Sequence, residues 1–265
     1  MTTSLRILVP LSDRKKPGGK EGVSLASARP SGLWSFRTLS PARRKALAAF
    51  RLAMAQQATA MKALCLGQAA FREAYIINRA FDRSRLASAL DRCNGTFAEA
   101  LRHHELVAAE RRRIEARVLF VCPLFGVLAP EDRLPDFRCP EGAKLPELGS
   151  LHRHWKPDVT KFLNRVLKGR HVLSFLPTRL GALWEPDGSA ASITVVRFGR
   201  KGPGGRPRGE TAAAPGLCGE AVRFVAEDDV QTPAEFSRFA SSLGHVNAPS
   251  WSTEEDGVRE QWFLR

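Results

Sequence analysis

The sequence predicts an α+β fold, with a central mixed sheet flanked by helices in a single domain of residues 1–265. Short apolar segments bounded by turn residues indicate strands, and longer segments rich in Ala, Leu and Met indicate helices. The two kinds of segment alternate loosely along the chain, and no internal repeat is visible. A chain of 265 residues is ample to bury one sizeable core.

Four segments are predicted to be strands. Residues 5–9 (LRILV), 117–121 (RVLFV) and 171–176 (HVLSFL) are short and apolar, and we expect all three in one sheet. The second of them is almost wholly apolar, which is typical of a central strand. Residues 192–198 (SITVVRF) are predicted to form a fourth strand.

Six segments are predicted to be helical. Ser40 is a good N-cap with Pro41 at the first helical position, and Thr232 and Glu235 fit a capping box. One helix is expected to be interrupted near Asn94 and Gly95, because Asn-Gly marks a turn. The predicted helices cover residues 40–64, 68–79, 84–101, 105–115, 151–167 and 232–243.

Two further segments are predicted to lie outside helices and strands. Residues 199–209 (GRKGPGGRPRG) are interpreted as a flexible basic loop because Gly and Pro dominate them. Residues 246–265 are interpreted as an acidic C-terminal tail.

Composition excludes several classes of protein. No apolar run reaches the ~20 residues that a membrane span needs, so no membrane partner is expected. Near the N-terminus a short apolar stretch precedes basic residues, the reverse of a secretory signal, and we expect a cytoplasmic protein. The five cysteines contain no C-x-x-C pair, which argues against a disulfide framework or a zinc ribbon.

The net charge of +14 is unevenly distributed. Residues 1–60 contain eleven Lys or Arg and two Asp or Glu, whereas residues 225–265 contain three and eight. This polarity suggests an electropositive surface for an anionic partner, either nucleic acid or a phosphorylated ligand. A general preference for Arg would raise the total in the same way, so charge alone leaves both interpretations open.

One candidate ligand pocket is predicted from residues that follow strands. Ser12, Asp13 and Lys15 come just after residues 5–9, where ligands bind in open sheets, and Lys15 could neutralise a phosphate. Asp13 could orient Lys15 or act as a base. Asp132 and Arg138 lie in one Pro-rich loop that could bring them together as a charge-assisted pair. The alternatives are a polar surface turn and a structural salt bridge.

A candidate nucleic-acid surface is predicted from two basic groups. Their side chains could contact phosphates without reading sequence, so DNA is a possible partner. The groups are Arg43, Arg44 and Lys45, and Arg200, Lys201, Arg206 and Arg208. Adjacent His103 and His104 lack the spacing that places two imidazoles on one helix face, so no metal site is predicted. No motif identifies a cofactor.

Three segments in order resemble the YaaA family of peroxide-stress proteins, in its actinobacterial form. PLSDRKKPGG at residues 10–19 resembles the family's P-P-S-E-G-K-x-x-G-G opening. LFGVLAPEDRLPDFR at residues 124–138 is similar to its G-L-W/Y-G-V-L-R-P-x-D-x-I-P-x-Y-R block. LPELGSL at residues 145–151, followed by WKP, resembles L-x-G-L-G-x-L…F-W-R-P. The resemblance implies a peroxide-stress protein that binds DNA through a basic groove and limits damage from peroxide and free iron.

The chain also departs from the family pattern, which indicates a divergent member. Tyr75 is its one tyrosine, and Cys93, Ala98, Phe137 and Leu180 stand where the family usually has tyrosine; Pro215 and Cys218 replace lysines. The alternative function is therefore an enzyme on this scaffold, acting on a small anionic or nucleotide-like substrate near the candidate pocket, and the sequence leaves catalysis undecided.

Overall fold

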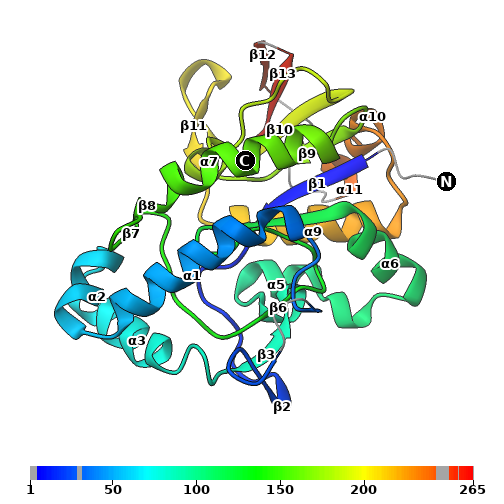
Figure 1. The fold of residues 1–265 in the computed structure, drawn as a ribbon. Coiled ribbons are helices and arrows are strands. Elements are labelled where there is room, and N and C mark those ends of the chain that lie inside the picture. Colours follow the sequence, from blue (N-terminus) through cyan, green and yellow to red (C-terminus); the bar gives the residue numbers. More distant parts are fainter. Residues whose placement is uncertain (1–4, 29–31, 243–250, 256, 265) are drawn as a thin grey trace.

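The computed structural model describes residues 5–28, 32–242, 251–255 and 257–264, which form an α+β fold around a mixed sheet (Figure 1). Within these residues the main sheet has eight strands. Its order is β12 (Trp251–Glu255), β13 (Val258–Leu264), β10 (Ser192–Lys201), β9 (His171–Ser174), β1 (Leu5–Pro10), β4 (Val118–Cys122) and β5 (Gly126–Leu128), with β11 (Pro207–Glu210) paired to β10.

The predicted strands are confirmed as neighbours in this sheet. β1 lies between β4 and β9 and pairs in parallel with both, so that Leu8 is in register with Leu119 and Ser174. β9 also pairs in parallel with β10. Every residue of β4 is buried, as expected for a central apolar strand. The parallel pairs place the carboxyl ends of β1, β4, β9 and β10 at one edge of the sheet.

Helices pack around the sheet and against one another. In the view of Figure 1, two of them, α1 and α7, lie across the front, and they are joined by a hydrogen bond between His154 Nε2 and the Ala42 carbonyl (3.0 Å). α5 and α9 form a second packed pair, in which a side chain at Gly219 would collide with the Phe97 carbonyl. The longer helices are α1 (Ser40–Met54), α2 (Gln57–Leu64), α3 (Gln68–Arg79), α5 (Thr96–Leu101), α6 (Ala108–Arg117), α7 (Leu151–Val166) and α9 (Ala214–Glu227).

The helix predicted over residues 40–64 is divided in two. Gln56 has extended backbone angles (φ −128°, ψ 131°), so α1 ends before it and α2 begins after it. Ser40 is not the N-cap: a 3-10 turn, η2 (Arg37–Leu39), precedes α1, and Leu39 takes the cap position. The sequence pattern did not reveal this break, because the helix-forming composition continues through it.

The helix predicted over residues 84–101 is partly wrong. Its first part is a strand, β3 (Arg85–Ser88), which pairs with β2 (Lys20–Ser24) and β6 (Arg133–Leu134) in a small second sheet. Pairing with segments distant in sequence overrides local helix propensity here. A short helix, α4 (Ala89–Arg92), follows, capped by the Ser88 hydroxyl, which accepts from the Asp91 backbone N–H. The predicted interruption before α5 is present.

The predicted basic loop of residues 199–209 is a β-hairpin. β10 continues to Lys201 and pairs with β11 around a 3-10 turn, η4 (Pro203–Gly205). Gly204 and Gly205 have φ of +66° and +77°, which glycine adopts at little cost. Hydrogen bonding between the two strands therefore orders a segment whose composition alone indicated flexibility.

The predicted acidic tail also contains strands. Residues 246–250 lie outside the described part of the chain, but β12 and β13 complete one side of the sheet. β13 lies between β12 and β10, and pairs in parallel with β10 from Ile193–Val258 to Gly199–Leu264. Before these strands, α10 (Pro233–Phe236) and α11 (Phe239–Ser242) replace the single predicted helix over residues 232–243, of which Leu243 lies outside the described residues. Of the predicted capping box, the Thr232 hydroxyl accepts from the Glu235 N–H, but the Glu235 carboxylate accepts from the Gln231 N–H instead of that of Thr232.

Most buried apolar side chains of the described residues form one cluster, and Leu33, Leu86 and Leu264 are buried outside it. Its largest member, Trp155 of α7, is fully buried against Gly126 of β5. A Cβ at Gly126 would lie 2.7 Å from the Trp155 ring, and its φ is +75°, so the position requires glycine. None of the helices in the described ranges has the length and apolar character needed to cross a membrane. The remaining short elements are β7 (Lys144–Leu145), β8 (Gly149–Ser150), α8 (Thr178–Gly181) and η3 (His103–Glu105).

Candidate functional site

A cavity of about 520 Å³ lies at the carboxyl edge of the parallel strands. Ser12 and Asp13, which follow β1, line it together with Pro123 after β4 and Phe175 after β9. The beginnings of α5 and α9 supply further lining residues. The connections after parallel strands meet here because the strands run in the same direction, and such edges are where open sheets bind ligands.

The walls of this cavity combine apolar rings with carboxylates. Phe97, Phe175 and Phe198 line it, as do Asp13 and Glu141. A third carboxylate in the lining, Glu210, forms an ion pair with Arg197 (3.4 Å). Among the described residues, the lining contains no Lys, Arg or His. Burial, and next the nearby carboxylate of Asp13, raise the pKa of Glu141 above its ordinary value, and Arg179 opposes this shift.

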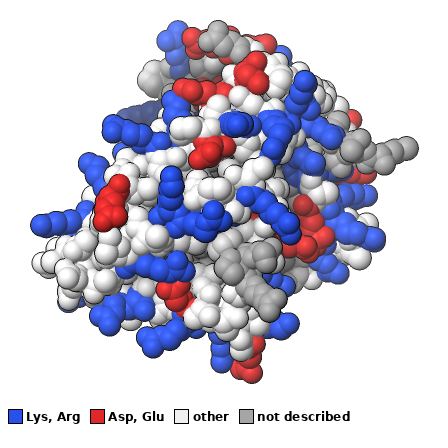
Figure 2. Space-filling view, viewed as in Figure 1, with Lys and Arg blue, Asp and Glu red and all other residues white. Residues whose placement is uncertain are grey.

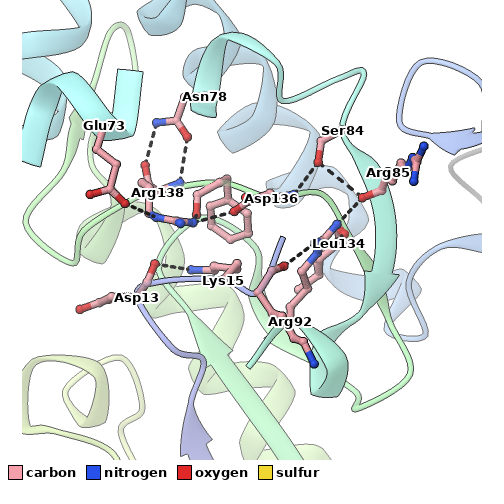
Figure 3. A network of polar contacts seen from close by, with 12 residues as sticks. Asp13, Lys15, Glu73, Asn78, Ser84, Arg85, Arg92, Leu134, Asp136 and Arg138 are labelled. Atoms are coloured by element: carbon pink, nitrogen blue, oxygen red, sulfur yellow. Dashed lines mark hydrogen bonds and ion pairs between the residues drawn. The ribbon is translucent and has the colours of Figure 1, made fainter. Parts of the chain in front are cut away.

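Lys15 lies in the protein interior rather than in the cavity lining. Its side chain is 2% exposed, and its Nζ donates to the Asp13 backbone carbonyl at 3.2 Å. The same nitrogen lies 4.1 Å from the centroid of the Phe137 ring, which is a cation–π distance. Burial lowers the pKa of Lys15 below that of an ordinary lysine. In Figure 3 the Asp13 carboxylate points away from Lys15.

Arg138 lies beside Lys15 in one polar network (Figure 3), but it is held by other partners. Its Nη1 donates to Asp136 Oδ1 at 2.6 Å, and Glu73 lies 3.9 Å from its Nε. Its backbone N–H and carbonyl both bond the Asn78 side chain, at 2.8 Å each. The structure thus brings Lys15 and Arg138 together, although neither lines the cavity that contains Ser12 and Asp13.

The expected pairing of Asp132 with Arg138 is wrong. Asp132 is buried, and its Oδ1 accepts from the backbone N–H and the hydroxyl of Ser35, both at 2.8 Å. Its Oδ2 accepts from the Ala129 N–H at 3.0 Å. Burial raises the pKa of Asp132, and these hydrogen bonds oppose the shift. The Asp132 carboxylate therefore stabilises the turn that begins at Ala129 and holds it against Ser35. Its role is structural, although its partners are not those of the expected salt bridge.

Arg92, which was not among the predicted site residues, connects three segments. This fully buried side chain donates Nε to the Leu134 carbonyl (3.0 Å) and Nη1 to the Lys16 carbonyl (2.6 Å). Its Nη2 donates to the Arg85 carbonyl (Figure 3). Arg92 therefore ties the turn after β1 to the small second sheet.

The predicted nucleic-acid residues divide into buried and exposed ones. Arg43 is fully buried, donating to the Phe125 and Val127 carbonyls at 3.0 and 2.9 Å, so it cannot contact a phosphate and its assignment is corrected. Arg44 and Lys45 are exposed on α1. The other four predicted residues, Arg200, Lys201, Arg206 and Arg208, are exposed on the β10–β11 hairpin.

Further basic side chains, which the sequence reasoning did not select, are exposed on α7. Arg153, Lys161 and Arg165 lie on this helix, which packs against α1. In α1 no residue is acidic, and in α7 Asp158 is the one acidic residue. Figure 2 shows Lys and Arg side chains spread across the face that α1 and α7 cover, with few acidic ones among them. An amphipathic reading of residues 151–167 could have revealed them.

A group of potential metal ligands lies elsewhere on the surface. Asp91, His103 and His104 place their ligand atoms within 4.8 Å of one another. His103 Nε2 is 3.0 Å from Asp91 Oδ1, and the pKa of His103 is lowered, chiefly by burial. The histidines therefore contact a carboxylate through tertiary structure, which their sequence spacing could not indicate.

Comparison with known proteins agrees with the motifs. A family model described as "Peroxide stress protein YaaA" matches residues 27–248. A UPF0246 protein of Streptomyces coelicolor is 33% identical over 102 residues, which are 38% of this chain and 39% of the relative. A UPF0246 protein of Rickettsia bellii is 24% identical over 148 residues, 55% of this chain and 59% of the relative. One of Rickettsia rickettsii is 24% identical over 182 residues, 68% of each chain. The matches to the first two of these relatives span less than two thirds of their length.

Proposed function

Because the chain belongs to the YaaA family of peroxide stress proteins, we propose that it acts in the cytoplasmic response to peroxide by binding DNA without sequence preference. The observation that carries this proposal is the basic face of α1 and α7. We call its exposed side chains the helical basic group: Arg44, Lys45, Arg153, Lys161 and Arg165.

The charge pattern of this face supports contact with a polyanion. These exposed Arg and Lys side chains can approach phosphates, although Arg165 also donates to the Thr38 hydroxyl at 3.1 Å. The two helices contain very few acidic residues that would repel DNA. Contacts to phosphates carry no sequence information, so binding should depend on salt and little on sequence. The exposed basic side chains of the β10–β11 hairpin form a second candidate group, the hairpin basic group: Arg200, Lys201, Arg206 and Arg208.

The alternative, an enzyme for a small anionic or nucleotide-like substrate, has less support from the geometry. Lys15 and Arg138 were its expected anion-binding groups, but Lys15 is buried over Phe137 and Arg138 is held by Asp136. The cavity at the strand ends instead presents carboxylates. A phosphorylated ligand would be repelled by them.

A salt titration tests the proposal. Two labelled duplexes of unrelated sequence would be titrated with the full chain, and fluorescence anisotropy recorded at several salt concentrations. We expect similar affinities for both, with log K falling linearly against log salt at a slope of about −0.9 per phosphate contact. Absence of binding at low salt, or strong discrimination between the two sequences, would contradict the proposal.

A further inference from the structure

The cavity at the strand ends differs in charge from the rest of the molecule. The chain has a net charge of +14, yet the charged side chains that line this cavity are Asp13, Glu141 and Glu210. We propose that the cavity binds a small organic cation, an amine or amidine attached to a planar apolar body, with Asp13 and Glu141 as the partners of its charge. None of the basic residues proposed to bind DNA lines this cavity.

The size and the walls of the cavity suit such a body. Its volume of about 520 Å³ is in the ordinary range for small-molecule sites. Phe97, Phe175 and Phe198 provide aromatic surface, and Phe175 and Phe198 lie nearly parallel, with ring centroids 6.3 Å apart. These rings are largely buried in the core, so the affinity that does not depend on charge would come from covering the apolar area that the lining as a whole leaves open to water.

The two carboxylates are available to a ligand. Within the described residues, neither the Asp13 nor the Glu141 side chain has a hydrogen bond or an ion pair of its own. Glu210 differs, because Arg197 already pairs with it. Asp13 and Glu141 are close enough for the charge of one to act on the other. A cation placed near both would remove their repulsion and gain two charge-assisted hydrogen bonds.

Positively charged features also lie around the cavity. The start of α9 contributes Ala214, Pro215 and Cys218 to the lining, and a helix N-terminus carries roughly half a positive charge. Arg179 lies outside the lining but acts on the Glu141 carboxylate. Lys15 lies behind the lining, where its Nζ donates to the backbone carbonyl of Asp13 and leaves the carboxylate unpaired. Within the described part of the lining, the charged side chains without an ion pair are the two carboxylates, and on them the preference for a cation rests.

A matched pair of probes tests the sign of the ligand. Tryptamine and indole-3-propionate share the ring and the two-carbon chain, and differ in having an ammonium or a carboxylate at its end. Isothermal titration with the full chain should show tryptamine binding at least about tenfold more tightly, since its ammonium can donate charge-assisted hydrogen bonds to the two carboxylates. Equal or tighter binding of indole-3-propionate would overturn the proposal, as would no binding of tryptamine at millimolar concentration.

Substitutions locate the site. Asp13→Asn and Glu141→Gln remove charge with little change of shape, and each should weaken tryptamine binding about tenfold. The exposed Glu131, which does not line the cavity, provides the control Glu131→Gln, which should bind as the parent chain does. Thermal unfolding of each variant checks that the fold persists. Unchanged tryptamine affinity in both cavity variants would overturn the assignment, whatever the outcome of the DNA titration.

Discussion

Arg43 and Arg44 are adjacent in sequence but occupy opposite sides of α1: the Arg43 guanidinium is buried and Arg44 is exposed. Arg43 donates to two carbonyls of the β4–β5 region and lies over the Trp34 ring, 5.3 Å from its centroid. Burial lowers the pKa of Arg43 to about 10, and it remains charged at neutral pH. Two neighbouring arginines of one basic run therefore differ in role: Arg43 stabilises the core, and Arg44 contributes positive charge to the surface.

Arg43→Ala should destabilise the fold by about 3 kcal/mol, because two carbonyls of the interior lose their donor. Arg44→Ala should change the free energy of unfolding by less than about 0.5 kcal/mol, as is usual for an exposed side chain. Urea unfolding followed by circular dichroism measures both. A loss of stability in Arg44→Ala equal to that in Arg43→Ala would show that the two positions are not distinct.

Arg92→Lys should also destabilise the protein, by about 2–3 kcal/mol. A lysine ammonium lacks the planar arrangement of N–H donors with which the Arg92 guanidinium bonds the Leu134, Lys16 and Arg85 carbonyls. The measurement is again urea unfolding, with the exposed Arg83→Lys as control. Stability retained in Arg92→Lys would mean that the three-segment connection contributes little.

For DNA, the salt slope should identify the surface. Replacing Arg44, Lys45 and Arg165 by Ala should flatten the slope of log K against log salt by two to three units, at about 0.9 for each phosphate that the variant no longer neutralises. Replacing Lys201, Arg206 and Arg208 tests the hairpin basic group, and we expect a similar change of about two to three units. The control, Arg111 and Arg112 to Ala on α6, should leave the slope nearly unchanged. A slope that changes only in this control would place the interface elsewhere.

Glu141→Gln should stabilise the ligand-free protein at neutral pH. Burial and the Asp13 carboxylate raise the pKa of Glu141, so the folded state prefers its protonated form, and ionised Glu141 lowers stability as pH rises through the folded-state pKa. The gain should be under about 1 kcal/mol, since the side chain is partly exposed. The stability difference between Glu141→Gln and the parent chain should vanish near pH 4, where Glu141 is protonated in the unfolded chain as well. Melting temperatures across this pH range measure it; a constant difference would exclude titration of Glu141 as its cause.

The cysteines should react unequally. Cys65 is exposed, whereas the other four, Cys93, Cys122, Cys139 and Cys218, are buried. Burial raises the pKa of Cys93 to about 12, and it raises those of Cys122, Cys139 and Cys218 as well, so these groups remain thiols. Mass spectrometry after brief iodoacetamide treatment should find one modified residue in the native chain and five after unfolding. Cys65→Ser should remove the native modification; rapid labelling of a buried thiol would contradict this.

Much of the fold was predictable because local pattern and tertiary position agree. The strands at residues 5–9 and 171–176 are short, apolar and buried, and they occupy the centre of the sheet. Residues 84–88 were mistaken for helix because their pairing with β2 and β6 depends on segments far along the chain. α9 was missed, since Pro215 and two glycines obscure its pattern.

The candidate site was less predictable. Ser12 and Asp13 lie in the cavity because position after a strand is a property of the sequence. Glu141, however, reaches it from a Pro-rich loop whose path only the folded structure defines. The burial of Arg43 was also not predicted, because residue type alone does not distinguish a buried arginine from an exposed one. The distinction depends on whether the position faces the core or the solvent once the helix is packed.

The parallel pairing of β10 with β13 has a consequence for synthesis on the ribosome. Its seven register pairs join segments separated by α9, α10 and α11, so this part of the sheet can close only late in synthesis. Until residues 258–264 emerge from the exit tunnel, the side of β10 that they will cover has unsatisfied N–H and C=O groups. A nascent chain stalled before that point would leave this strand edge open to pairing with other unfolded chains, which favours aggregation.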